Sequence, residues 1–227
     1  MSHRTDTRGF TFMEVMTAVL ILCIVMATLY KAYSSNVETV QSGRENSQTR
    51  QVVRIVFDLM KKDLESAFMT AANSVPKWRL GLIGKSRLIG NRKADGIDFT
   101  TASKFASLGD PVQTDLCEVG YFVEQEREGD GFILYRREDL TLDTDFTEGG
   151  VVEELTRAVK VFEILYEDSQ GQEVSGWSTT QGGAQGVLPT LIKVRLTLES
   201  PSGREETYRM SVHPELAWRK GESSAIR

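Results

Sequence analysis

A single carboxylate at the start of a long apolar segment is the feature of this sequence with the clearest chemistry. Glu14 is followed by fifteen uncharged residues, Val15 to Leu29. A carboxylate at the centre of a membrane-spanning helix costs roughly 2.5–3.5 kcal/mol, and less near the helix end, so such an acid needs a named partner. We therefore predict that Glu14 forms an ion pair with a cation from outside this apolar segment.

The apolar segment is long enough to hold Glu14 in a membrane-spanning helix. Phe10 to Leu29 is twenty residues, and at 1.5 Å per residue a helix of this length matches the roughly 30 Å of a bilayer's hydrocarbon core. A short polar leader, Met1 to Gly9, precedes it and carries Arg4 and Arg8 against Asp6. We therefore expect a positively charged leader followed by a single membrane helix.

The position of Gly9 separates this segment from an ordinary secretory signal. A secretory signal has a small-residue cleavage site after its apolar core, but here the core is followed by Tyr30-Lys31-Ala32-Tyr33. Gly9 instead lies before the core. Cleavage after Gly9 would make Phe10 the new N-terminus, retain the whole helix and leave Glu14 as the fifth residue.

The segment Arg8 to Glu14 resembles the signal of type IV prepilins and pseudopilins. The resemblance implies that a prepilin peptidase, a membrane aspartyl protease, cleaves between Gly9 and Phe10 and N-methylates Phe10. A free α-amine is largely protonated at neutral pH, so in a helical stack of subunits it can compensate the Glu14 carboxylate of a neighbour. Glu14 is then an assembly contact. In the alternative, a plain type II membrane anchor, Glu14 snorkels to the headgroups and Gly9 has no role.

Length and charge fit a small anchored domain. The chain has 227 residues, and one membrane helix leaves enough for one domain or a domain plus a stalk. The formal net charge is −5, and it becomes −6 when the leader is removed. No basic stripe is present, which argues against a nucleic-acid partner.

Neither the cysteines nor the acidic residues form a catalytic or metal-binding pattern. Cys23 lies in the membrane segment and Cys117 in the exported part, so we expect no disulfide between them and expect Cys117 in the core. The acidic stretch Asp139 to Glu148 contains Asp143-Thr144-Asp145, which starts like a calcium loop but lacks the third ligand and the glycine. We expect a solvated loop there, and no metal, cofactor or enzymatic activity.

Helical periodicity continues beyond the membrane segment. The first proline is Pro76, so one helix can extend to about Ala72, with a bend or local weakening at Ser42-Gly43. One apolar face is predicted for its second half. It contains Val53, Phe57, Met60, Leu64 and Phe68.

After Pro76 the pattern becomes alternating, which predicts antiparallel strands. The clearest hairpin is Leu191 to Arg209, turning at Pro201-Ser202-Gly203. Further strands are predicted at Leu116–Glu126, Phe132–Arg137, Val159–Glu167 and Gly96–Thr100. The predicted fold is α+β and pilin-like, a long helix packed on antiparallel sheet. The predicted segments are a leader (1–9), a transmembrane helix (10–31), its periplasmic continuation (32–75) and a β-rich periplasmic domain (76–227).

Within the pilin-like proteins, the chain resembles the J-type minor pseudopilin of the type II secretion system. The resemblance rests on Phe57-Asp58-Leu59 and Asp63-Leu64 in the helix, and on Trp177 and Leu188-Pro189 before a late strand. It implies a subunit anchored in the bacterial inner membrane and placed at the tip of the periplasmic pseudopilus. There it would help initiate assembly and support export of folded proteins, with the I and K minor pseudopilins and the major pseudopilin as partners. Glu14 argues against the K type, which departs at that position.

Two alternatives to a pseudopilin remain. The first shares every feature of the first 70 residues, and the second shares the membrane anchor. A minor pilin of a type IV pilus would act in adhesion, motility or DNA uptake, and gene neighbourhood separates it from a pseudopilin. A membrane-anchored periplasmic binding protein that never assembles would keep its function when Glu14 is replaced by alanine.

Overall fold

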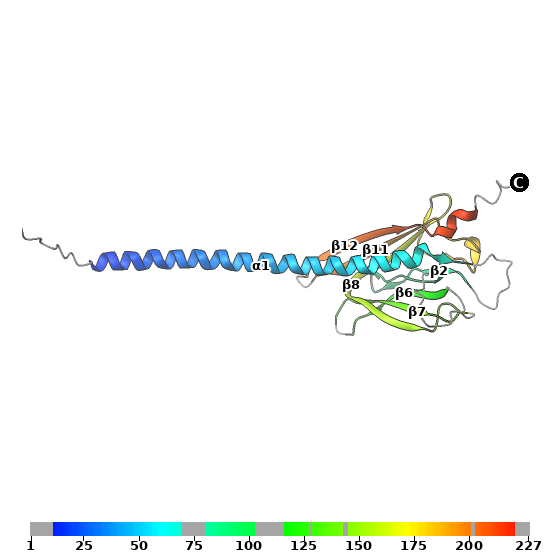
Figure 1. The fold of residues 1–227 in the computed structure, drawn as a ribbon, viewed down its shortest axis with the longest axis horizontal. Helices are drawn as coiled ribbons and strands as arrows, with labels where there is room; N and C mark the ends of the chain where they lie inside the picture. The colour runs from blue at the N-terminus through cyan, green and yellow to red at the C-terminus, as the bar shows by residue number, and fades with distance from the viewer. Residues whose placement is uncertain are drawn as a thin grey trace, which may run out of the picture. The chain divides into compact units, whose positions relative to one another are not determined.

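The computed structural model describes residues 11–69, 80–102, 116–127, 129–142, 145–200 and 203–220. The chain divides into two units, Met1–Gln48 and Thr49–Arg227. Helix α1, Phe12–Glu65, contributes to both of them (Figure 1). Its backbone stays helical through Ser42 and Gly43, where the sequence predicts a bend or local weakening.

The described part of the first unit is the apolar portion of α1. Phe12–Tyr33 is 22 residues long with a mean hydropathy of 2.4, and none of it is buried by the chain itself. This helix is long and apolar enough to cross a membrane, as a single-pass anchor requires.

In the second unit, the last part of α1 packs on a sheet. Val53, Met60 and Leu64 are buried and Phe57 is partly buried, so these members of the predicted apolar face are confirmed. Val56 joins them in the core.

The helix ends at Glu65, and the prediction that it reaches Ala72 with Phe68 on its apolar face is wrong. Ala67–Phe68 forms strand β1, which pairs with strand β5, Gly96–Thr101. The sheet also binds the carbonyl groups that the end of a helix leaves without intrahelical partners. The backbone N–H of Ala102 donates to the Ser66 carbonyl at 3.0 Å. Pairing with β5 therefore outcompetes further helix.

Among the described residues, ten strands form one antiparallel sheet with the order β10-β2-β5-β6-β7-β8-β11-β12, while β1 pairs with β5 and β9 with β8. The predicted α+β class is confirmed. The remaining strands of the sheet are β2 (Leu82–Lys85), β6 (Cys117–Gln125), β7 (Phe132–Asp139), β8 (Val151–Glu167), β9 (Glu173–Val174), β10 (Trp177–Ser178), β11 (Leu191–Glu199) and β12 (Glu205–Val212). A separate small hairpin joins β3 (Leu88–Ile89) and β4 (Arg92–Lys93), and two 3-10 turns lie at Gly182–Ala184 and Glu215–Lys220.

Both predicted hairpins form, but β8 is longer than predicted. β11 pairs with β12 from Ile192↔Val212 to Glu199↔Glu205, and β6 pairs with β7. The predicted strand Val159–Glu167 is only the second half of β8. The first half pairs with β7 and the second with β11, and the strand changes partner at Ala158, a non-glycine residue with φ of 56°. Such an irregularity bends a strand and lets it contribute to two parts of a sheet.

Candidate assembly site

Glu14 lies in the first turn of α1, where it caps the helix. Its carboxylate Oε2 accepts hydrogen bonds from the Thr11 backbone N–H and from the Thr11 hydroxyl, both at 3.0 Å. In return, the Glu14 backbone N–H is 3.3 Å from Thr11 Oγ1. This reciprocal arrangement is a capping box, which satisfies donors at the helix start. Gly9 and Phe10, the predicted cleavage and methylation residues, lie outside the described residues.

The surroundings of Glu14 favour contacts with other molecules. The neighbouring side chains Phe12, Met13 and Val15 are exposed, and no lysine or arginine of the described helix pairs with the Glu14 carboxylate. Within the described chain, the hydrogen bonds to Glu14 therefore come from Thr11 alone. A cation from elsewhere would add compensation that Thr11 cannot supply.

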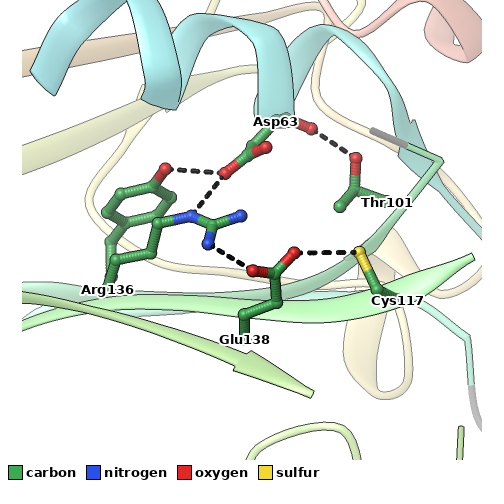
Figure 2. Close-up of polar contacts among 6 residues, drawn as sticks. Asp63, Thr101, Cys117, Arg136 and Glu138 are labelled. Atoms are coloured by element: carbon green, nitrogen blue, oxygen red, sulfur yellow. Dashed lines mark hydrogen bonds and ion pairs between the residues drawn. The ribbon is translucent and has the colours of Figure 1, made fainter. Parts of the chain in front are cut away.

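A second polar site, the Asp63 junction, joins the end of α1 to the sheet. We define it as Asp63, Thr101, Tyr121, Arg136 and Glu138, most of which Figure 2 labels. Asp63 Oδ2 accepts from Arg136 Nε at 2.9 Å and from the Tyr121 hydroxyl at 2.7 Å. The Thr101 hydroxyl donates to the Asp63 carbonyl at 2.7 Å, and Arg136 Nη1 donates to Glu138 Oε2 at 2.9 Å. The junction thereby ties the last turn of α1 to strands β5, β6 and β7.

The central ion pair of the junction, Asp63 with Arg136, is nearly excluded from solvent. The Asp63 and Arg136 side chains are only 2% and 8% exposed. Burial and then the negative charge of Asp63 raise the pKa of Tyr121, so its hydroxyl stays a donor. Burial opposes the charge of Arg136, but hydrogen bonds to Glu138 and Asp63 outweigh it and raise the pKa of Arg136. Opposite charges with satisfied hydrogen bonds are the arrangement in which buried ions are tolerated.

Cys117 lies beside the junction as a core residue. It is fully buried, which confirms the sequence prediction, and its Sγ is 4.0 Å from Glu138 Oε1 (Figure 2). Cys23 is exposed on the apolar helix.

The acidic loop between β7 and β8 is organised by its own hydrogen bonds. Asp139 Oδ1 accepts from the Thr141 backbone N–H at 2.8 Å, and Asp145 Oδ1 accepts from the Thr147 hydroxyl at 2.6 Å. Asp143 lies outside the described residues. Among those that are described, no three acidic, histidine or cysteine side chains are grouped to hold a metal ion.

One member of the junction can be recognised from the sequence. Asp63 lies between Met60 and Leu64 on the predicted apolar face, so its burial could be inferred. Its partner Arg136 is 73 residues away on a strand. The periodicity of either segment alone does not identify that contact.

Two buried tyrosines of the sheet allow a matched test of the junction. We expect Tyr121→Phe to lower the free energy of unfolding by about 1–3 kcal/mol, because it removes a hydrogen bond to a charged acceptor. Tyr166→Phe makes the same chemical change at a buried hydroxyl that has no hydrogen-bond partner among the described residues, so it is expected to be neutral or stabilising. Urea unfolding of the full chain in detergent, followed by tryptophan fluorescence, measures both. Equal losses would contradict a special role for the Tyr121 hydroxyl.

Comparison with known proteins gives two family matches. Residues 31–209 match the family described as type II secretion system (T2SS), protein J, and residues 4–30 match the prokaryotic N-terminal methylation motif. A search of curated proteins finds no match. Among solved structures, a chain in the GspK-GspI-GspJ complex from the type 2 secretion system of enterotoxigenic Escherichia coli is similar. It is 17% identical, with a TM-score of 0.48, and the match covers 72% of this chain and 96% of that one.

The family match confirms the J-type resemblance drawn from the sequence and accounts for well over half of the residues. The chain belongs to the type II secretion system protein J family.

Proposed function

We propose that this chain is a structural subunit at the tip of the type II secretion pseudopilus, made from a precursor by cleavage between Gly9 and Phe10. One observation carries the proposal. The methylation motif ends at residue 30, and the protein J match begins at residue 31. A maturation signal and a pseudopilin domain are therefore contiguous in one chain. The role is one of assembly, without enzymatic activity.

The helix start provides the proposed assembly contact. In the precursor, the carboxylate of Glu14 is held by Thr11. After cleavage, the methylated amine of Phe10 in a neighbouring subunit would supply the cation that no described residue provides to Glu14. The exposed apolar residues from Phe12 to Tyr33 would contact lipid before assembly and neighbouring helices after it.

The second unit is proposed to lie in the periplasm, with the helix anchored in the inner membrane. The similar chain from Escherichia coli comes from a complex of GspK, GspI and GspJ. We propose that this chain likewise assembles with I and K minor pseudopilins, and below them with the major pseudopilin. In that position it would help start the filament and support export of folded proteins. Copurification of tagged chain with those subunits tests the assignment.

Maturation has a direct test. When the chain is made together with a prepilin peptidase, we expect its N-terminal peptide to start at Phe10 and to carry one N-methyl group. Mass spectrometry of the purified chain measures both changes. An intact Met1, or a terminus near Ala32, would contradict the proposed processing. A variant with Gly9 replaced by valine is expected to keep residues 1–9.

A further inference from the structure

The first half of β8, Val151–Arg157, has one unpaired edge. β7 covers one side of it, from Glu138↔Val151 to Phe132↔Val159. β11 covers the other side of β8 only from Val159 onward. Among the described residues, no strand pairs with the outer edge of Val151–Arg157. We call this segment the β8 edge.

The β8 edge has only part of the usual protection of exposed edges. Natural proteins protect edge strands with charged side chains, above all lysine, and with prolines, short length or bulges. This segment has neither lysine nor proline, but it carries Glu153, Glu154 and Arg157. Its pairing with β7 is irregular between Glu154 and Thr156 and again between Thr156 and Val159.

Val151 and Val152 are 68% and 50% exposed, and Leu140, the residue that follows β7, is also exposed. β12, the last strand in the sheet order, has no large hydrophobic residue of comparable exposure.

The second half of β8 shows which side chains a neighbouring strand needs in order to pair with β8. There, Glu163 forms an ion pair with Arg195 of β11 at 2.6 Å. Glu167 pairs with Lys193 of β11 at 2.9 Å. The residues of β11 that alternate with these two cations are apolar and buried. The acids of β8 are therefore matched by a strand in which basic and apolar residues alternate.

The β8 edge also carries valines and acids, here without a covering strand and with one valine and one acid on each face. Alternation along the strand places Glu153 with Val151 on one face, and Glu154 with Val152 on the other. Glu154 is already paired with Arg157 at 2.6 Å. Glu153 has no ion pair among the described residues. A basic residue opposite Glu153 and an apolar residue opposite Val152 would complement these two exposed side chains.

We propose that the β8 edge docks an extended segment of a partner protein in which basic and apolar residues alternate, and that this segment adds a strand to the sheet. Backbone hydrogen bonds would supply affinity, and contacts with Glu153 and Val152 would supply selectivity. A second copy of this chain fits less well. In the register that pairs the whole edge with itself, Glu154 lies opposite Glu154, and like charges in direct opposition destabilise a pair.

The probe for the test is a fluorescent peptide, Thr-Leu-Ile-Lys-Val-Arg-Leu-Thr-Leu-Glu, which copies the sequence of residues 190–199. Fluorescence anisotropy measures its binding to the full chain in detergent, and amide hydrogen exchange locates it. We expect bound peptide to slow exchange within Val152–Arg157 by tenfold or more. Glu153→Lys is expected to weaken binding at least tenfold, and Glu153→Gln to weaken it less. Glu205→Lys, an exposed change on β12, is the matched control and should alter affinity less than twofold.

Several results would overturn the proposal. The first is hydrogen exchange at the β8 edge that does not change when the peptide is bound. The second is a loss of affinity in Glu205→Lys as large as that in Glu153→Lys. The third is equal affinity for the original peptide and for one with glutamates in place of its lysine and arginine. Faster exchange in β12 would show that the peptide displaces β11 instead. A dimer of the full chain that Glu153→Lys dissociates, seen by sedimentation, would assign the edge to a second copy.

Discussion

Replacement of Asp63 by alanine is expected to lower the free energy of unfolding of the second unit by about 3–5 kcal/mol, the usual result of removing one partner of a buried ion pair. The variant would leave the Arg136 guanidinium buried, with only Glu138 as an anionic partner in the junction. It would also remove the acceptor of the Tyr121 hydroxyl. Urea unfolding of the full chain in detergent, followed by tryptophan fluorescence, measures the loss.

Asp58→Ala is the matched control on the same helix. Asp58 pairs with Arg54 at 3.7 Å, but its side chain is 72% exposed. An exposed pair of this kind contributes only about 0.3–0.5 kcal/mol. A loss as large as that of Asp63→Ala would show that both variants act through the helix itself and would contradict the junction's role.

A double variant separates the charge from the packing. Combining Asp63→Ala with Arg136→Leu removes both buried charges and keeps an apolar side chain on β7. We expect it to recover part of the stability lost in Asp63→Ala, because a buried ion pair can often be replaced by apolar residues at little cost. No recovery would mean that the loss arises from the missing Tyr121 and backbone contacts.

Local periodicity was sufficient for the elements whose faces are set by burial alone. The apolar face from Val53 to Leu64 and the hairpin of β11 and β12 follow directly from spacings of about 3.6 and 2 residues. The apolar residues of the hairpin, Ile192, Val194, Leu196 and Leu198, are all buried. In these segments, the sequence repeats one pattern long enough to decide both the element and its buried side.

The features that periodicity missed depend on contacts between distant residues. The end of α1 at Glu65 is set by strand pairing of Ala67 with Thr101. The change of partner at Ala158 is set by where β11 ends. The Asp63 junction joins residues up to 73 positions apart. Each of these three features depends on a contact between residues far apart in the chain. The pattern within one short stretch of sequence therefore cannot predict it.

The candidate site at the start of the chain, by contrast, consists of residues that are close together in the sequence. The roles proposed for Gly9, Phe10 and Glu14 rest on their order and spacing, because a processing signal would be read by another enzyme as a short linear segment. The contact between Thr11 and Glu14 is visible only in the structure. It gives Glu14 a second possible role, as a helix cap, beside the proposed role in assembly.

Glu14→Ala is expected to reduce incorporation of the chain into the pseudopilus at least tenfold, while the amount in the membrane stays unchanged. The reason is electrostatic. An amine brought into the helix stack without a compensating carboxylate costs roughly 2.5–3.5 kcal/mol at membrane depth, which corresponds to about two orders of magnitude in an equilibrium constant. Immunoblots of sheared pseudopili and of membrane fractions measure the two pools. Glu14→Gln, which keeps the shape but not the charge, is expected to fail similarly.

Thr11→Val is the control that distinguishes charge pairing from capping. It removes the hydroxyl that donates to the Glu14 carboxylate and accepts from the Glu14 backbone N–H. The Glu14 carboxylate itself stays in place. Loss of a helix cap costs about 0.5–2 kcal/mol, which a helix of 54 residues can absorb, since its remaining hydrogen bonds are unaffected. We therefore expect Thr11→Val to assemble nearly as well as the unmodified chain. If Thr11→Val and Glu14→Ala fail equally, the carboxylate acts by holding the helix start, and the proposed pairing with a neighbour's amine is wrong.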